Sequence, residues 1–258
     1  MQDFKGKVLF ISGGTRGIGK AMVYEFASKG CDVAFTYASN EEIAKEIIAD
    51  VESIHGVKAR AYKLNILEPL TYKDVYKEFD EDFDRLDYFI SNAIISGRAV
   101  VGGFAPFMRL KPKGLGNIYT ATVEAFVVGA QEAAKRMEKT GGGSIISMSS
   151  TGNIVYTPYY AGHATNKAAV ETMVKYAAAE LGEKGIRVNA VSGGPIDTDA
   201  LKAFPNYKEV KAEVIKRSPL SRMGDATDLT GACSFLCSDA ASWLTGQVIV
   251  IDGATSFQ

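Results

Sequence analysis

The chain has 258 residues, of which 47% are apolar and 23% charged, the composition of an ordinary globular protein. This composition excludes disordered, collagen-like and coiled-coil proteins. With 29 Lys and Arg against 30 Asp and Glu, the net charge of −1 gives no overall reason to bind nucleic acid or an anionic membrane.

The N-terminal sequence and the cysteines favour the reducing cytoplasm. The chain opens with charged residues and no signal-peptide pattern, and no apolar run approaches the length of a membrane span. Its three cysteines, Cys31, Cys233 and Cys237, form no CxxC pair, and two histidines leave too few ligands for a metal site. We therefore expect a soluble cytoplasmic protein without a bound metal or a membrane partner.

Seven short runs of β-branched and aromatic residues predict strands. They span residues 8–12, 32–37, 58–64, 88–91, 144–149, 187–192 and 247–251. The segments between them have apolar residues at helical spacing, and this alternation predicts right-handed crossovers. We expect an α/β fold with a doubly wound parallel sheet of about seven strands and helices on both faces. No compositional break divides the chain, so residues 1–258 are interpreted as a single domain.

Three local features refine this pattern. Ser39 followed by Glu42 predicts a capping box at the start of the second helix. Residues 96–116, with five Gly and two Pro, predict a long loop, and residues 193–222, with three Pro, predict a second irregular stretch. Ligands of open parallel sheets bind beyond the carboxyl ends of strands, where both stretches emerge.

A glycine-rich turn follows the first predicted strand directly. It reads Ser12-Gly13-Gly14-Thr15-Arg16-Gly17-Ile18-Gly19 and leads into a helix. Such glycines let backbone N–H groups and a helix N-terminus approach a pyrophosphate, so this context favours a dinucleotide. The next strand ends without a carboxylate to bind the ribose 2′-OH, and Arg16 supplies a cation for a 2′-phosphate, with Ser39 available as a neutral partner. The sequence therefore favours NADPH, with NADH possible.

Several motifs together resemble the short-chain dehydrogenase/reductase family. They are residues 12–19, Ser91-Asn92-Ala93, Ser149-Ser150, a downstream Tyr and Lys, Asn189 to Pro195 with Thr198, and Asp252-Gly253. They come in the family's order over essentially the whole chain. The resemblance implies a Rossmann-type domain, commonly a homotetramer formed through two long helices, here about residues 121–137 and 165–181.

The spacing before the family's catalytic Lys is unusual. Most members place Tyr four residues before that Lys, whereas this chain has His163 four before Lys167. Phenols stand instead at Tyr156, Tyr159 and Tyr160, and the spacing Tyr160-x6-Lys167 is that of the enoyl-acyl carrier protein reductase branch. Residues 141–201 are similar to the type III enoyl reductases (FabL), and Ile94 and Thr120 replace the Gly and Asn of most members.

Helix geometry makes this spacing chemically intelligible. Seven residues at about 100° each return to within about 20° of the start, which places Tyr160 and Lys167 about 10 Å apart on one helix face. When hydride goes to the β-carbon of an enoyl thioester, negative charge develops on the thioester oxygen, further from the nicotinamide. Tyr160 is therefore expected to stabilise the enolate and Lys167 to hold the nicotinamide ribose. Ser150 occupies the place of the family's catalytic Ser, so the resemblance implies a catalytic or pocket-lining role for it, and His163 is expected to pack or form hydrogen bonds.

The resemblance also implies the remaining contacts. Cofactor-binding residues would be Gly13, Thr15, Arg16, Ile18, Ser39, Asn65, Ile66, Asn92, Ala93, Lys167, Pro195, Ile196 and Thr198. The substrate pocket would contain Tyr160, Ile94, Ile95, Leu201 and Phe204, with a substrate-binding loop at about residues 196–222. Six basic residues of that loop could meet an acidic carrier protein: Lys202, Lys208, Lys211, Lys216, Arg217 and Arg222. An ordinary amphipathic surface helix is the equal alternative for this segment.

These observations predict an NADPH-dependent reductase of trans-2-enoyl thioesters in fatty acid elongation. Its substrates would be enoyl-acyl carrier protein or enoyl-CoA, and nucleic acid is not expected as a partner. One alternative is a short-chain carbonyl reductase or alcohol dehydrogenase with Tyr160 or Tyr156 as the acid. A second is a non-catalytic NADP-binding regulator that has lost the usual Tyr.

Overall fold

The computed structural model describes residues 4–95, 100–202 and 207–257. Within these residues, seven parallel strands form one sheet in the order β3-β2-β1-β4-β5-β6-β7. The strands are β1 Val8–Ile11, β2 Asp32–Tyr37, β3 Ala59–Lys63, β4 Tyr88–Ser91, β5 Gly143–Ser150, β6 Ile186–Gly193 and β7 Val248–Ile251. The predicted fold class is confirmed, and each predicted strand is present with small differences at its ends.

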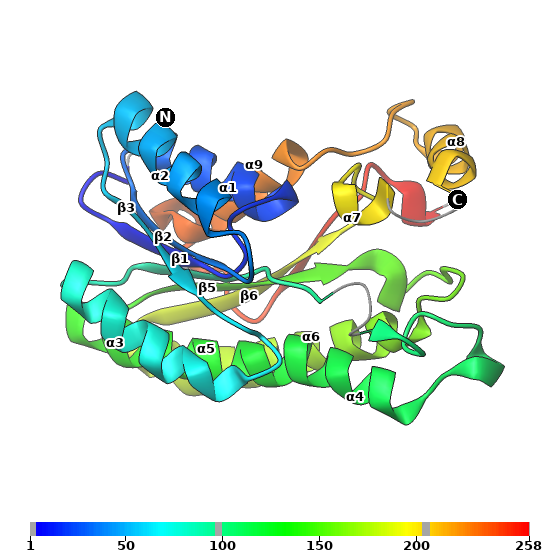
Figure 1. Cartoon of the computed structure of the whole chain (residues 1–258), viewed down its shortest axis with the longest axis horizontal. Coiled ribbons are helices and arrows are strands. Elements are labelled where there is room, and N and C mark those ends of the chain that lie inside the picture. Colours follow the sequence, from blue (N-terminus) through cyan, green and yellow to red (C-terminus); the bar gives the residue numbers. More distant parts are fainter. Residues whose placement is uncertain (1–3, 96–99, 203–206, 258) are drawn as a thin grey trace.

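Helices cover both faces of the sheet. One face carries α1 (Gly17–Ser28), α2 (Glu41–His55) and α9 (Thr227–Cys237), and the other carries α3 (Tyr72–Asp82), α5 (Ala125–Met137) and α6 (Ala161–Leu181) (Figure 1). Successive strand residues alternate between the two layers: Leu9 and Ile11 pack with the first group of helices, and Phe10 packs with the second. Because both faces of the sheet are covered, the central strands β1 and β4 are almost wholly buried and consist mainly of apolar residues.

The strand order reverses beside β1, whose neighbours are β2 and β4. A ligand site is expected beyond the carboxyl ends of strands at such a switch point. Short 3₁₀ turns connect the remaining elements: η1 Pro69–Thr71, η5 Glu138–Thr140, η6 Thr151–Asn153, η7 Gly182–Lys184, η8 Asp239–Ala241 and η9 Thr255–Phe257.

The predicted cap of the second helix is wrong by one residue. Helix α2 begins at Glu41, and its cap is Asn40, whose side chain accepts a hydrogen bond from the Ile43 N–H at 3.1 Å. Asn caps a helix as well as Ser does, and this start places Glu41 and Glu42 in the first turn, where acidic side chains complement the helix dipole. The Ser39–Glu42 capping box therefore does not form.

The predicted long loop at 96–116 is only partly correct. From Val100 onward the chain forms one 3₁₀ turn, η3 (Phe107–Arg109), and then α4 (Pro112–Tyr119). Pro112 stands at the first position of that helix, where Pro is favoured because no internal N–H bond is lost. Helix α4 continues through a π-helical turn, η4 (Thr120–Glu124), into α5, so the predicted long helix begins earlier than residue 121.

The stretch after β6 contains two helices, α7 (Asp199–Lys202) and α8 (Tyr207–Arg217). Both lie at the same end of the sheet as α4 but on the opposite side of it (Figure 1). The two predicted irregular stretches therefore flank the same end of the sheet.

No described helix has the length and apolar character needed to cross a bilayer. No group of three or more His, Cys, Asp and Glu side chains in residues 4–95, 100–202 and 207–257 is placed to hold a metal ion.

Candidate active site

The turn between β1 and α1 is fixed to the end of β4. The buried Ser12 hydroxyl accepts hydrogen bonds from the Asn92 and Ala93 N–H groups, each at 3.0 Å. In return, Asn92 Nδ2 donates to the carbonyls of Ser12 and Gly13, each at 3.0 Å. These bonds fix the glycine-rich turn to the end of β4, at the point where the strand order reverses.

Close backbone approach explains why glycines occupy this turn. A Cβ at Gly19 would lie 1.9 Å from the Gly13 carbonyl oxygen, and Gly13 has a φ of +74°. Helix α1 begins at Gly17, and no side chain caps it at Arg16, so its first N–H groups are available to an anion. Ile18 lies in this first turn and packs against the core. The residues present therefore fit the pyrophosphate of a dinucleotide.

The predicted ribose and adenine contacts lie at the surface. Arg16 and Ser39 are exposed, and Thr15 is partly buried in the turn. The Asn65 amide is engaged locally, because Nδ2 donates to Glu68 at 2.9 Å and Oδ1 accepts from the Leu67 N–H at 3.1 Å. Ile66 packs its side chain into the core, which leaves its backbone as the available contact.

Tyr160 and Ser150 meet where β5 ends and α6 begins. The Ser150 Oγ accepts a hydrogen bond from the Gly152 N–H at 3.3 Å, and a Cβ on Gly152 would stand 3.5 Å from that Oγ and 2.5 Å from the Tyr160 ring. Burial raises the pKa of Tyr160, and the neighbouring Ser150 side chain offsets part of that rise, so Tyr160 is protonated at neutral pH. Tyr160 is the N-cap of α6, directly before its first residue, and has helical backbone angles.

The other two nearby phenols are poorly placed for chemistry. Tyr156 is 87% exposed and Tyr159 is 54% exposed. Tyr160 is the most buried of the three and lies beside Ser150. It packs against Gly152, where a Cβ would lie 2.5 Å from the Tyr160 ring.

Lys167 is a buried cation on α6. It is 7% exposed, and its Nζ donates to the Met148 carbonyl at 2.6 Å. Burial lowers the pKa of Lys167 to about 8, and the Glu171 carboxylate one turn later opposes this effect. Glu171 is in turn held by the Ser149 hydroxyl, which donates to it at 2.5 Å. Ser149 therefore supports Lys167 through Glu171, while Ser150 lies beside Tyr160.

His163 lies between two aromatic rings in this cluster. Its ring centroid is 4.3 Å from that of Phe104 and 5.4 Å from that of Tyr160, nearly parallel to the latter. Burial, with a contribution from Lys167, lowers the pKa of His163 to about 3, so the imidazole is neutral at physiological pH. The Phe104 contact was not predicted, because an aromatic residue in a glycine-rich stretch carries no periodic signal.

The segment after β6 reaches the glycine-rich turn. Ile196 is buried and forms a backbone bridge with Gly224. The Thr198 methyl group lies 3.6 Å from where a Cβ of Gly17 would stand. Pro195 and Ile196 also line a cavity together with Val214, Leu220 and Ile251. The structure therefore brings together the turn and the predicted nicotinamide segment.

The predicted substrate residues are less completely placed. Ile94 is exposed, Ile95 packs against the core, and Leu201 is partly buried. Phe204 lies outside the described residues.

Four of the six basic residues proposed to meet a carrier are engaged within the chain. Asp197 contacts Lys202 at 3.5 Å and Lys211 at 2.7 Å, and also accepts from the Tyr207 hydroxyl at 2.8 Å. Arg222 pairs with Asp228 at 2.6 Å, and Arg217 donates to the Thr255 carbonyl at 2.8 Å. Lys208 and Lys216 are exposed. These internal contacts weaken the prediction that the segment is a basic docking surface.

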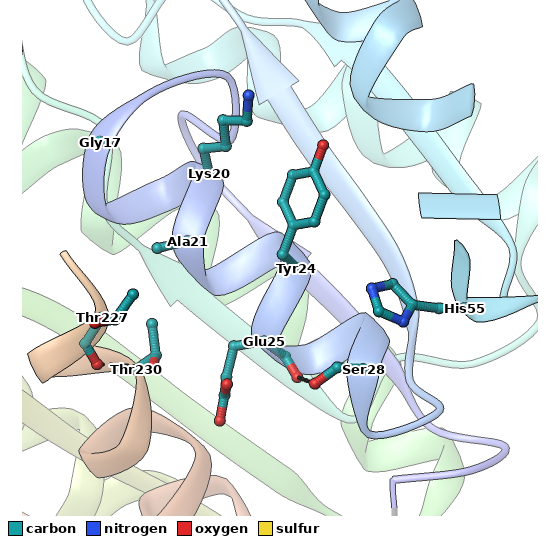
Figure 2. Close-up of a pocket in the computed structure, with 9 residues that line it drawn as sticks. All are labelled: Gly17, Lys20, Ala21, Tyr24, Glu25, Ser28, His55, Thr227 and Thr230. Carbon is teal, nitrogen blue, oxygen red and sulfur yellow. Dashed lines mark hydrogen bonds between the residues drawn. The ribbon is translucent and has the colours of Figure 1, made fainter. Parts of the chain in front are cut away.

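A separate open depression lies on the outer side of α1 (Figure 2). It is lined by Gly17, Lys20, Ala21, Tyr24, Glu25, Ser28, His55, Thr227 and Thr230. Two of its polar side chains have partners, since Glu25 pairs with Lys29 at 2.7 Å and Tyr24 donates to Asp50 at 3.0 Å. None of the residues of the Tyr160 cluster lines it.

The fold and this site together define a class of protein. A parallel sheet with a pyrophosphate-binding turn and a Tyr, Ser and Lys cluster beside it is the arrangement of a nicotinamide-dependent oxidoreductase. The chain belongs to the short-chain dehydrogenase/reductase family, whose members bind NAD(P)H. A family model described as enoyl-(acyl carrier protein) reductase matches residues 13–255.

Known relatives are similar over nearly the whole chain. The 1-cyclohexenylcarbonyl-CoA reductase of Streptomyces collinus is 34% identical and covers 97% of this chain and 87% of its own. The 3-oxoacyl-[acyl-carrier-protein] reductase FabG of Staphylococcus aureus is 31% identical, covering 96% of this chain and 97% of its own. A short-chain type dehydrogenase/reductase structure from Mycobacterium ulcerans has a TM-score of 0.90 at 25% identity, covering 99% of this chain and 92% of its own.

Proposed function

We propose that this oxidoreductase is an NADPH-dependent reductase of trans-2-enoyl thioesters, of the type III enoyl-acyl carrier protein reductase kind. The observation that carries the proposal is the position of Tyr160. This buried phenol stands seven residues before Lys167, while the position four residues before Lys167 holds a neutral His163. The donor is thereby displaced toward the site of charge in an enoyl thioester.

The reaction adds a hydride to the β-carbon and a proton to the α-carbon, giving the saturated thioester. Bound NADPH supplies the hydride. Tyr160, protonated at neutral pH, donates a hydrogen bond to the thioester oxygen as negative charge develops there. Ser150 orients the Tyr160 hydroxyl, and Lys167 holds the nicotinamide ribose and adds a favourable positive charge.

The choice of NADPH rests on the end of β2. Residues 38–40 carry no carboxylate that would repel a 2′-phosphate, and Glu41 is paired with Lys45 at 3.0 Å. The exposed Arg16 beside the turn is the proposed 2′-phosphate partner. A single domain over 1–258, a homotetrameric assembly and a cytoplasmic location stay predictions.

Carbonyl reduction is the second candidate function. The FabG relative is named for 3-oxoacyl substrates, and a protonated Tyr160 hydroxyl beside Ser150 also suits a ketone oxygen. The Streptomyces relative supports the enoyl proposal, because 1-cyclohexenylcarbonyl-CoA is an α,β-unsaturated thioester.

The test is NADPH oxidation by the purified protein with crotonyl-CoA, crotonyl-acyl carrier protein, acetoacetyl-CoA and simple ketones. We expect oxidation with the crotonyl thioesters and one saturated thioester formed per NADPH, measured by mass spectrometry. Tyr160→Phe should lower kcat by about 10²- to 10³-fold without changing the Kd for NADPH. Tyr156→Phe, at an exposed phenol, is the control and should leave kcat unchanged.

The outcomes separate the candidates. Oxidation with ketones alone would overturn the enoyl proposal in favour of carbonyl reduction. Binding of NADPH without turnover of any substrate would favour the non-catalytic regulator.

A further inference from the structure

His163 carries a buried polar atom that the described residues leave without a partner. The side chain is 4% exposed, and its Nε2 has no hydrogen-bond partner among those residues. Buried polar atoms of folded proteins are nearly always paired, and an unpaired one destabilises the protein. Such an atom within a candidate active site points to a ligand group that completes the bond.

The ring is fixed in position by its neighbours. Phe104 and Tyr160 lie at centroid distances of 4.3 Å and 5.4 Å, with interplanar angles of 34° and 24°. His163 precedes Lys167 by one helical turn of α6, so the two side chains share a helix face. The imidazole therefore lies beside the Tyr160 ring, on the helix face that carries Lys167.

The charge state limits what this imidazole can do. Burial and Lys167 keep it neutral at physiological pH, so it has no proton to give as an imidazolium acid. A neutral imidazole still has one N–H donor, and a donor beside a developing oxyanion stabilises it without transferring its proton. Tyr160 alone leaves the remaining lone pairs of such an oxygen free.

We propose that His163 is a catalytic residue whose neutral Nε2–H donates a second hydrogen bond to the substrate's carbonyl oxygen beside Tyr160. This assignment rests on the proposed function, in which that oxygen is the thioester oxygen. The N–H bond stays intact throughout, so His163 stabilises the enolate and exchanges no atoms with it. Phe104 holds the ring in place.

The kinetic test compares two substitutions. His163→Leu keeps the approximate volume and removes the donor, whereas His163→Gln places an amide N–H near the position of Nε2. We expect His163→Leu to lower kcat/KM for crotonyl thioester by about 10²-fold. His163→Gln should stay within about tenfold of the wild type, and both should keep the wild-type Kd for NADPH.

Stability supplies a readout that a purely structural role would not give. Removing an unpaired buried nitrogen should leave the Tm of His163→Leu equal to or above that of the wild type. A less active variant of undiminished Tm supports the proposal. Activity of His163→Leu within twofold of wild type, or loss of activity in proportion to lost stability, would overturn it.

Histidine NMR tests the contact directly, because the chain has two histidines, His55 and His163. In ¹⁵N-histidine-labelled protein, His163→Leu assigns the signals. Crotonyl-CoA added with NADP⁺ should shift the His163 Nε2 resonance and leave that of His55 in place. A bound thioester with no His163 shift would overturn the assignment.

The same experiments distinguish this proposal from the proposed function. If the wild type reduces ketones only, the enoyl function is overturned. The kcat/KM of His163→Leu relative to the wild type, and the NMR shift, are then measured with the ketone. An unchanged kcat/KM with the ketone would overturn the role of His163. If the wild type turns over neither substrate class and neither shifts the His163 resonance, both proposals are overturned.

Discussion

The glycine-rich turn and the Tyr160 cluster lie at the same end of the sheet but treat their polar atoms differently. In the turn, Ser12 and Asn92 are bonded to backbone groups on both sides of the switch point. In the cluster, the Lys167 ammonium is buried with a lowered pKa, and His163 Nε2 has no partner within the described residues. The side chains that shape the turn are thus paired within the protein, whereas the cluster contains a buried cation and, at His163 Nε2, an unpaired polar atom.

This difference predicts two kinds of response to mutation. In the turn, backbone segments pack closely, so a small added side chain should weaken both cofactor binding and stability. In the cluster, the polar groups serve the reaction and are costly to bury, so removing one should lower activity and leave stability equal or higher.

The largest expected effect is that of Lys167→Met. It should lower kcat/KM by about 10³-fold, within the range of single catalytic groups. The variant should nevertheless be at least as stable as the wild type at pH 7, because it no longer buries a charge. Lys175→Met, at an exposed lysine of the same helix, is the matched control and should change neither quantity.

Lys167 also gives a pH dependence of known sign. Its folded pKa of about 8 lies below its ordinary value of 10.5, so the unfolded chain binds more protons between these pH values. The wild-type free energy of unfolding should therefore rise relative to that of Lys167→Met from pH 8 to 10. Above pH 8, Lys167 loses its proton and its positive charge, so kcat/KM for NADPH should fall. Denaturant titrations at each pH measure the first effect, and a difference that does not vary with pH would contradict it.

Gly19→Ala should break the turn itself. The added Cβ would meet the Gly13 carbonyl oxygen at 1.9 Å, so the turn must open, and we expect at least about 10²-fold weaker NADPH binding with lower stability. Gly116→Ala is the control, because nothing lies within 4 Å of its added Cβ. Calorimetry and denaturation measure the two effects, and unchanged NADPH binding by Gly19→Ala would argue against a close-packed turn.

Arg16→Ala should alter cofactor preference without disturbing the turn, since Arg16 is exposed. A charge-assisted bond to the 2′-phosphate predicts a fall of about tenfold in the NADPH over NADH ratio of kcat/KM. The NADH value itself should be unchanged. Equal losses with both cofactors would place Arg16 on the pyrophosphate instead.

The smallest effect is expected for Asn40→Ala, next to the turn but outside its chemistry. Loss of the α2 cap should lower the free energy of unfolding by about 1 kcal/mol with kcat/KM retained. Ser39→Ala should cost much less, because Asn40 makes the capping bond. A larger loss of unfolding free energy in Ser39→Ala than in Asn40→Ala would instead support the Ser39–Glu42 capping box.

The sheet could be predicted because its strands are short runs rich in β-branched and aromatic residues, and the seven runs are present in the structure. The predictions fail where one residue type is common in two kinds of structure. Pro is typical both of loops and of the first position of a helix, and Pro112 begins α4. Ser39 and Asn40 can both cap a helix, and only the tertiary structure selects Asn40.

The site could be predicted where residues are neighbours in sequence or belong to a known motif, as for Ser12 to Gly19, Ser150, Tyr160 and Lys167. Contacts between distant segments were not foreseen. Phe104 reaches His163 from another part of the chain, and the Glu171 link to Ser149 joins α6 to β5. The internal ion pairs of Lys202, Lys211 and Arg222 likewise depend on tertiary placement that charge counting does not supply.

Asp197 links α8 to the segment that follows β6. Its carboxylate accepts hydrogen bonds from Tyr207 and Lys211 of that helix. Its backbone N–H, between Ile196 and Thr198 in the chain, donates to the Gly224 carbonyl. The segment proposed to meet the nicotinamide is thus fastened to α8 mainly by partly exposed charges, whose attraction falls with ionic strength. A rise in salt concentration should therefore weaken the attachment of α8 to this segment, while the neutral hydrogen bonds of the glycine-rich turn should be unaffected.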